Sequence, residues 1–181
     1  MPKGPMPWKR GRTLRDNDFG ILRVREDVFT DPRDGSEHPR VVIDASEWAN
    51  VVAYTTDGKV ILVRQFRFGS GEAGLELPGG VVDEGETPAQ AVARELEEET
   101  GHRPATVEPT GWLWPNPAHF TNRVHTFIAR DCERVHDGTP EGSEDLVVEL
   151  VNAGAIPSLI RSGEIRHALH VAALHLARLA G

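Results

Sequence analysis

The sequence predicts an α+β fold, of the α/β type in the broad sense: a mixed β-sheet lies between helices, and a strand-rich extension precedes it. Short β-rich segments punctuated by glycine, proline and aspartate recur along the chain, and only two well-separated segments have a helical pattern. The chain has 181 residues, of which 39% are hydrophobic and 27% charged. These values suit one ordinary domain with an extension.

The expected strands and helices follow in order along the chain. The dipeptide Asp57-Gly58 is a strong hairpin signal between two β-rich runs, and residues 31–35 form a turn after the first strand. Strands are expected at residues 21–29, 40–44, 48–55, 60–68, 106–113, 123–129 and 146–151, and a short run at residues 75–78 follows a glycine-rich segment. Helices are expected near residues 88–100 and 163–179.

Charge divides the chain into three parts. Residues 1–15 form a basic, proline-rich tail with five basic and no acidic side chains, although the whole chain has a net charge of −8. The tail could bind nucleic acid or a membrane, but its shortness favours a solvated terminus, and the acidic remainder repels nucleic acid. Residues 16–45 form the β extension, a candidate dimerisation element, and residues 46–181 form the main domain.

Several classes of protein are excluded by what the sequence lacks. No apolar run is long enough for a membrane-spanning helix, and the basic N-terminus lacks the apolar stretch of a signal peptide, so we expect a cytoplasmic protein. Cys132 is the only cysteine, which excludes an internal disulfide and a cysteine-rich zinc site.

The helix expected at residues 88–100 is sharply delimited. Thr87 and Gln90 have the spacing of a capping box, Pro88 suits the first turn, and Gly101 can supply the left-handed C-terminal turn. The acidic residues Glu95, Glu97, Glu98 and Glu99 occupy its last turns. Negative charge at that end opposes the helix dipole by about 0.3–1 kcal/mol each, which a sequence selected only for stability would avoid.

The spacing of these acids indicates a metal site. Glu95, Glu98 and Glu99 share one helix face, and the opposing apolar stripe is expected to consist of Ala89, Val92, Ala93 and Leu96. Two carboxylates 4 Å apart repel by about 4 kcal/mol at an effective dielectric constant of 20. A hard divalent cation, Mg²⁺ with Mn²⁺ as a substitute, removes that repulsion. The alternative is a solvated acidic helix face.

This helix also carries a longer pattern. Gly80, Glu86 and residues 94–101 fit G-x5-E-x7-R-E-U-x-E-E-x-G-U, in which U is a bulky apolar residue, and thus resemble the Nudix box. Seven fixed identities and the apolar Leu96 match, whereas His102 occupies the last apolar position. The resemblance covers about an eighth of the chain. It implies a Nudix-type fold and metal-dependent hydrolysis of a nucleoside diphosphate linked to another group.

The resemblance also implies roles for single residues. Arg94 and Glu98 belong to the implied catalytic residues, and Arg94 would orient the glutamates. Glu86 would brace the loop before the helix or reach the metal through water. The implied metal ligands are the Gly79 carbonyl, Glu95, Glu98 and Glu99.

The surroundings of the box resemble those of ADP-ribose pyrophosphatases within this superfamily. Residues 75–80 look like the segment that precedes the box in that group, whose N-terminal extension often mediates dimerisation, so a homodimer is expected. Pro117 matches a proline sixteen positions after the last glycine of the box and is implied to contact substrate. Its neighbours depart from the usual Ser-Pro-Gly, so ADP-ribose and other nucleoside diphosphate sugars both remain candidate substrates.

Residues outside the box complete the implied site. Glu144, which precedes an Asp and an apolar strand, is the first candidate for the catalytic base, and Glu141 is the second; either can instead be an exposed loop acid. Arg67 is the candidate for holding the substrate diphosphate, with a surface arginine as the alternative. Glu76 can contact substrate or metal, or form a structural ion pair.

Two other signals are weaker. Residues 69–74 match G-x-G-x-x-G, but no helix can follow directly, which argues against a dinucleotide site. His167, His170 and His175 suit surface or interface positions better than a metal site, because no third ligand is evident. The sequence therefore favours a magnesium-dependent pyrophosphatase, with a non-catalytic nucleotide-binding module as the alternative.

Overall fold

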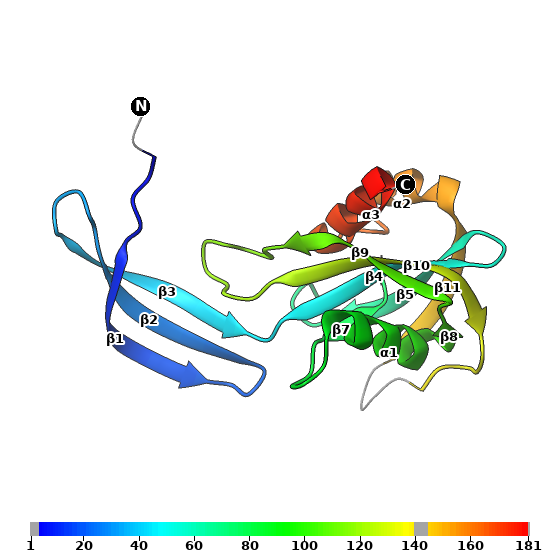
Figure 1. Cartoon of the computed structure of the whole chain (residues 1–181), viewed down its shortest axis with the longest axis horizontal. Coiled ribbons are helices and arrows are strands. Elements are labelled where there is room, and N and C mark those ends of the chain that lie inside the picture. Colours follow the sequence, from blue (N-terminus) through cyan, green and yellow to red (C-terminus); the bar gives the residue numbers. More distant parts are fainter. Residues whose placement is uncertain (1–3, 140–144, 181) are drawn as a thin grey trace. The chain divides into compact units, whose positions relative to one another are not determined.

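The computed structural model describes residues 4–139 and 145–180. The chain divides into two compact units. Figure 1 shows both of them as a ribbon that is coloured along the sequence. The first unit comprises Met1–Ser46 and Trp114–Asn122, and the second comprises Glu47–Leu113 and Arg123–Gly181. The motif-bearing helix therefore belongs to the second unit.

The second unit is built on a mixed sheet. Its central strands run in the order β11-β5-β4-β10-β8, while β6 pairs with β5, β7 with β4 and β9 with β10. The β4–β10 pair is parallel and the other pairs are antiparallel. The strands are β4 (Trp48–Thr55), β5 (Lys59–Arg67), β6 (Glu72–Glu76), β7 (Gly79–Val81), β8 (His102–Arg103), β9 (Thr106–Leu113), β10 (Val124–Arg134) and β11 (Leu146–Asn152).

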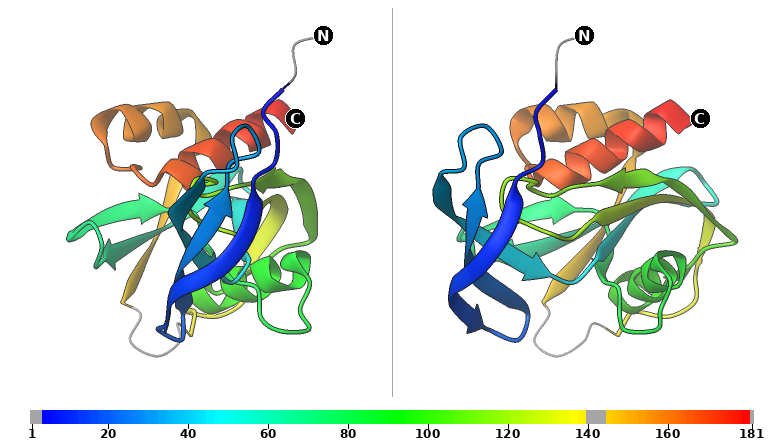
Figure 2. Two further views of the ribbon diagram at one scale, coloured as in Figure 1. Left: turned by 90° about the vertical axis from the view of Figure 1, so that its left-hand side faces the viewer. Right: turned by 60° about the vertical axis from the view of Figure 1, so that its left-hand side comes forward.

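Helices cover both faces of this sheet. They are α1 (Pro88–Thr100), the short 3₁₀ helix η1 (Ala153–Ala155), α2 (Ile156–Ser162) and α3 (Ala168–Ala180). Figure 2 shows α1 on one side of the sheet and α2 and α3 on the other. Side chains of β4 alternate between the two cores: Val51 packs with α1, and its neighbour Val52 packs with α2 and α3. The predicted fold class, a mixed sheet between helices, is confirmed.

The predicted C-terminal helix is wrong in its first part. Residues 163–179 were expected to form one helix, but Gly163 instead ends α2 in a left-handed conformation with φ of 80°, and α3 begins only at Ala168. Glycine adopts this conformation without the steric cost that other residues meet. The break places His167 in the turn between two helices.

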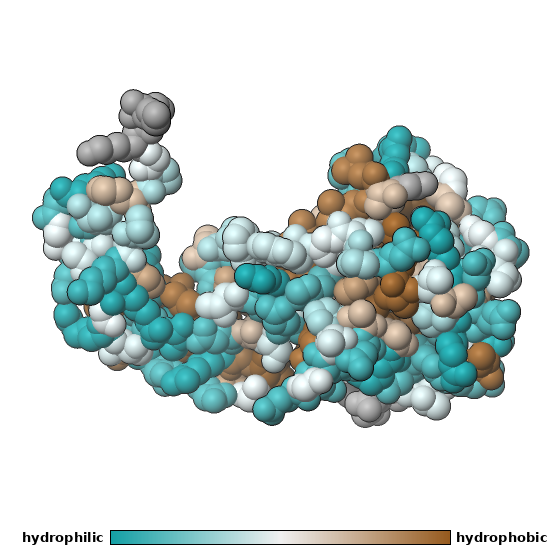
Figure 3. Space-filling model, viewed as in Figure 1, coloured by the Kyte–Doolittle hydropathy of each residue, from teal (hydrophilic) through white to brown (hydrophobic). Residues whose placement is uncertain are grey.

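The first unit is an antiparallel three-stranded sheet in the order β1-β2-β3. Its strands are β1 (Lys9–Asp18), β2 (Leu22–Thr30) and β3 (Glu37–Ala45). Much of its visible surface is hydrophilic in Figure 3. Charged residues link the strands in pairs, including Arg15 with Glu26 at 3.3 Å and Arg25 with Asp44 at 2.5 Å.

Residues 9–15 of the predicted solvated tail are exposed but lie in a regular strand, β1. This strand is exposed along its whole length, so it has no alternating apolar pattern by which a strand is recognised. Cross-strand polar contacts hold β1 against β2. Arg10 Nε lies 2.9 Å from Oδ2 of Asp27, whose side chain is fully buried, and the Thr13 hydroxyl donates to the same carboxylate. Arg10 and Arg15 thus serve as partners for acids of β2, and Arg12 pairs with Glu37 of β3.

Candidate active site

Helix α1 is fixed at both ends by the residues that the sequence indicated. The Thr87 side chain accepts a hydrogen bond from the Gln90 backbone and the Gln90 side chain accepts one from the Thr87 backbone, which completes the capping box. Gly101 ends the helix in the left-handed conformation, and its N–H donates to the Glu97 carbonyl. The register of every glutamate on the helix is thereby set.

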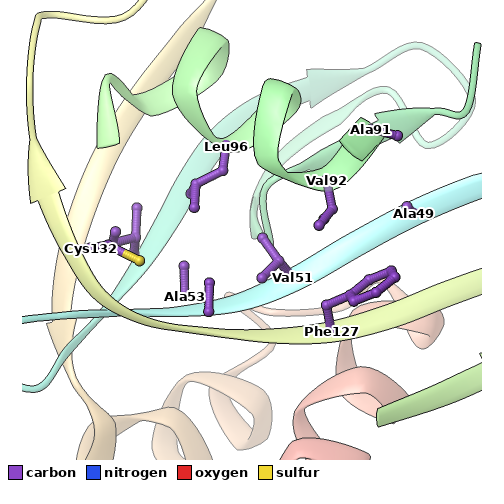
Figure 4. Close-up of a cluster of buried hydrophobic side chains, with 10 residues drawn as sticks. Ala49, Val51, Ala53, Ala91, Val92, Leu96, Phe127 and Cys132 are labelled. Atoms are coloured by element: carbon purple, nitrogen blue, oxygen red, sulfur yellow. The ribbon is translucent and has the colours of Figure 1, made fainter. Parts of the chain in front are cut away.

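The apolar face of α1 anchors the helix on the sheet. Figure 4 shows Val92 and Leu96 pointing toward Val51 and Ala53 of β4. Ala91 is fully buried and Ala89 is exposed, so the predicted stripe is wrong at Ala89. The helix is turned so that its last turn also faces inward, and Glu99 is only 5% exposed.

Arg94 connects the acidic residues of the motif. Its guanidinium donates to both carboxylate oxygens of Glu86, each at 3.1 Å, and through Nη1 to Glu95 Oε1 at 3.0 Å and Glu98 Oε2 at 2.9 Å. It also donates to the Val81 carbonyl at 3.2 Å. Hydrogen bonding to Arg94 lowers the pKa of Glu86 below its ordinary value. One arginine therefore holds three carboxylates in place through charge-assisted hydrogen bonds.

The strand before α1 shapes the space around the glutamates. The Gly79 N–H donates to Glu99 Oε2 at 3.0 Å, which holds this buried carboxylate against β7. A Cβ added to Gly80 would overlap Glu95 Oε1 and lie 2.5 Å from Glu95 Cδ. The absence of a side chain at residue 80 thus makes room for a carboxylate.

Residues of α1 and β7 line one open cavity of about 540 Å³, here called the α1 cavity. Glu95, Glu99 and Gly79 line it, together with Arg94 and Arg67. Glu98 is tied to the same network through Arg94. Trp48, Gln65 and His167 also line the cavity, and no sequence motif had pointed to the first two.

Arg67 and Glu76 form a two-bond ion pair at the edge of this cavity. Arg67 Nε lies 3.1 Å from Glu76 Oε1, and Nη2 lies 2.8 Å from Oε2. The arginine side chain is 42% exposed, whereas that of Glu76 is only 6% exposed. Glu76 is thus placed to orient the arginine, which lines the α1 cavity.

Two histidines and a tryptophan pack beside this pair. The rings of His167 and His170 stack with centroids 4.2 Å apart and planes 18° apart, and Trp48 stacks on His170 at 5.5 Å. The Leu77 N–H donates to His170 Nδ1, which lies 3.7 Å from Glu76 Oε2. Burial lowers the pKa of both histidines, so both are neutral near pH 7.

Two sets of residues could hold a metal. Ligand atoms of Glu76, His167 and His170 lie within 4.8 Å of one another. However, the lone pairs of near-parallel stacked rings do not converge on one point, and both Glu76 oxygens bond to Arg67. The carboxylates of Glu95 and Glu99, gathered on one cavity beside the backbone of β7, are the hard oxygen donors that Mg²⁺ and Mn²⁺ prefer.

The remaining predicted site residues lie elsewhere. Pro117 belongs to the first unit, where it is exposed and lines a groove of about 340 Å³ with Trp8, Val41 and Phe120. Glu141 and Glu144 lie outside the described residues. The roles assigned to these three residues stay predictions.

His167 is the site residue that sequence reasoning dismissed. The spacing of His167 and His170 was noticed, but the expected single helix would have made both ordinary helix positions. The glycine at residue 163, four residues before His167, was the available signal that a short helix ends there and that the C-terminal helix begins later. None of the described helices is both long and apolar enough to cross a membrane.

Comparison with known proteins agrees with this geometry. The family model of the NUDIX domain matches residues 47–169. GDP-mannose pyrophosphatase of Salmonella arizonae is 32% identical over 185 residues, covering 95% of this chain and 96% of that protein. The enzyme of the same name from Escherichia coli K12 is 32% identical over 167 residues, covering 87% and 86% of the two chains.

A solved structure shares the fold. The crystal structure of an ADP compounds hydrolase superposes with a TM-score of 0.84 at 21% identity, covering 97% of this chain and 95% of that one. With a matched family model, relatives along most of its length and the complete acidic motif on a capped helix, the chain belongs to the NUDIX family and is a Nudix hydrolase.

Proposed function

We propose that this hydrolase cleaves the pyrophosphate bond of a nucleoside diphosphate sugar and releases a nucleoside monophosphate and a sugar phosphate. GDP-mannose, suggested by the names of the relatives, and ADP-ribose, suggested by the sequence around the box, are the first substrates to test. The observation that carries the proposal is the meeting of Glu95, Glu99, Gly79 and Arg67 on one cavity.

The glutamates of α1 would hold Mg²⁺ or Mn²⁺ in this cavity. Glu95 and Glu99 line it, Glu98 joins them through Arg94, and the Gly79 carbonyl is the fourth proposed ligand. A bound divalent cation would neutralise charge on the diphosphate oxygens and acidify a water molecule. A diphosphate would otherwise be repelled by these carboxylates.

Other residues would bind the substrate and take up a proton. The Arg67 guanidinium, held by the buried Glu76, would donate to the non-bridging oxygens of the diphosphate. Glu144, or failing that Glu141, would accept a proton from the attacking water. Most of the barrier to such hydrolysis is lowered by positioning and charge neutralisation.

The proposal is tested by product analysis. The full-length protein is incubated with GDP-mannose or ADP-ribose, with and without Mg²⁺, and nucleoside monophosphate is separated by chromatography. We expect metal-dependent release with at least one substrate, and a loss of about 100-fold or more in Glu95→Gln and Glu99→Gln. Binding of both substrates without any turnover would instead favour the nucleotide-binding module.

The base is tested by a matched pair of substitutions in one loop. We expect Glu144→Gln to lower kcat by roughly 100-fold or more and Glu141→Gln to leave it nearly unchanged. The reverse result would assign the role to Glu141, and two active variants would remove both residues from the mechanism.

We also propose that the first unit mediates a homodimer. This unit exposes the large apolar side chains Met6, Leu14, Phe19, Ile21 and Val41. Light scattering during gel filtration is expected to show a dimer that Val41→Asp dissociates and Val147→Asp, an exposed position in the second unit, does not. A monomeric wild-type protein would refute this proposal.

A further inference from the structure

A second cavity adjoins the α1 cavity. It has a volume of about 340 Å³ and is here called the β6 cavity, because Glu72, Gly74 and Glu76 of strand β6 form one of its walls. Arg67 and His167 line both cavities. A ligand whose diphosphate lay against Arg67 could therefore extend from one cavity into the other without leaving the protein surface.

The chemistry of the β6 cavity suits hydroxyl groups. Arg166 and Glu72 both line this cavity and form an ion pair, in which Arg166 Nη1 lies 2.6 Å from Glu72 Oε2. Ser70 also lines the cavity. A sugar hydroxyl both donates and accepts hydrogen bonds, so a guanidinium and a carboxylate side by side can satisfy it. Among the described residues that line this cavity none is Phe, Tyr or Trp, the rings on which a nucleobase usually stacks.

His167 stands where the two cavities meet. Its Nδ1 is buried and has no hydrogen-bond partner among the described residues. Because an unpaired buried N–H is rarer and more costly than an unpaired acceptor, the proton is favoured on Nε2. Since His167 lines both cavities, Nε2 is the ring nitrogen that a ligand can reach, and it would act as a donor.

The ring of His167 is also held in one orientation. It stacks on His170, which is fully buried, and lies 5.8 Å from the ring of Trp48. Gly163 produces the turn that brings His167 to this position, and the Glu164 carbonyl ties the turn to β6 by accepting from the Leu75 N–H at 2.9 Å. A donor fixed in this way is preorganised for one ligand position.

We propose that the β6 cavity receives the sugar of the nucleoside diphosphate sugar, with His167 Nε2 donating to the sugar or to the oxygen that joins it to the diphosphate, and with Glu72 and Arg166 binding its hydroxyls. This inference rests on the proposed function, because it takes the diphosphate to lie at Arg67. It makes His167, Glu72 and Arg166 specificity residues.

The test compares a sugar-bearing with a sugar-free ligand. KM and kcat are measured for GDP-mannose and ADP-ribose, and the β-methyl ester of GDP, which keeps the diphosphate but lacks the sugar, is measured as a competitive inhibitor. We expect His167→Ala and Glu72→Gln each to raise KM for the better substrate by about tenfold. The inhibition constant of the methyl ester is expected to stay within about twofold of the wild-type value in Glu72→Gln.

Matched variants separate a binding role from a structural one. His167→Gln keeps a hydrogen-bond donor at a similar distance, so its KM for the sugar nucleotide is expected to lie close to the wild-type value. His175 is an exposed histidine of α3, and His175→Ala is expected to leave both KM and kcat unchanged. Glu72 is exposed, so Glu72→Gln is expected to fold normally. This variant therefore still tests the inference if His167→Ala fails to fold.

Three results would overturn the inference. One is an unchanged KM for the sugar nucleotide in both His167→Ala and Glu72→Gln. Another is an equal loss of affinity for the methyl ester and the sugar nucleotide in Glu72→Gln, which would place this residue at the diphosphate. A wild-type protein that hydrolyses neither sugar nucleotide would refute the proposed function and this inference with it.

Discussion

At Gly80, the addition of a single methyl group is expected to lower catalytic activity without destabilising the fold. A Cβ there would overlap the carboxylate of Glu95 but no backbone atom among its nearest neighbours. We expect Gly80→Ala to displace Glu95 and lower kcat by about 100-fold, because small misplacements of a reacting group have effects of that size. The unfolding midpoint is expected to move little.

The control for this change is Gly154→Ala, since a Cβ at residue 154 would meet nothing within 4 Å. Steady-state kinetics and thermal unfolding of both variants provide the check. Equal activities for the two variants would mean that Glu95 does not need its observed position.

Arg94 is the second residue whose role can be measured alone. Arg94→Lys keeps the positive charge but cannot donate to Glu86, Glu95 and Glu98 together. We expect the free energy of unfolding in urea, without divalent cations, to fall by about 1–3 kcal/mol, since partly buried carboxylates lose their partner.

Arg103→Lys is the matched control for Arg94→Lys. Arg103 pairs with Glu97 at the end of the same helix, but its side chain is 63% exposed. Exposed ion pairs contribute little, so a change within about 0.5 kcal/mol is expected. A similar loss in both variants would show that Arg94 has no special role in stability.

At the scale of elements, the capping box of α1 offers a direct test. Thr87→Ala removes the side-chain acceptor for the Gln90 N–H and is expected to cost about 1 kcal/mol of unfolding free energy. Thr87→Ser keeps that oxygen and should retain most of the stability. Chemical denaturation of the three proteins decides, and a serine variant as unstable as the alanine variant would contradict the role of the cap.

The elements differ in how well the sequence predicted them. The bounds of α1 and β4 agree with expectation because caps, turn residues and a dense apolar pattern mark them locally. Strand β1 and helix α2 escaped prediction for different reasons. The first is held by charged cross-strand pairs, and the second is a helix of only 7 residues that precedes the expected C-terminal helix.

At the scale of the whole molecule, buried neutral histidines make stability depend on pH. Burial lowers the pKa of His102 and, much further, of His170. The unfolded chain takes up protons on these residues below about pH 6.5, whereas the folded protein takes up fewer, because burial disfavours the charged imidazole. Stability is therefore complete above that pH and falls as the pH decreases, by up to about 1.4 kcal/mol per pH unit for each histidine.

Urea unfolding at several values between pH 5.5 and 7.5 measures this slope. His170→Gln is expected to reduce it, and His175→Gln, at an exposed position of the same helix, is expected to leave it unchanged. A wild-type stability that does not vary over this range would show that the buried histidines accept protons in the folded state.

The sequence alone determined the local features of this protein: the helix of residues 88–100, its caps, and the spacing that puts Glu95, Glu98 and Glu99 beside Arg94. These depend on contacts within a few residues, which helical geometry fixes. Tertiary packing was needed to show that Gly79 holds Glu99, that Gly80 makes room for Glu95, and that His167 stands between two cavities. Those relations join residues far apart in the chain, so they arise from how strands and helices pack.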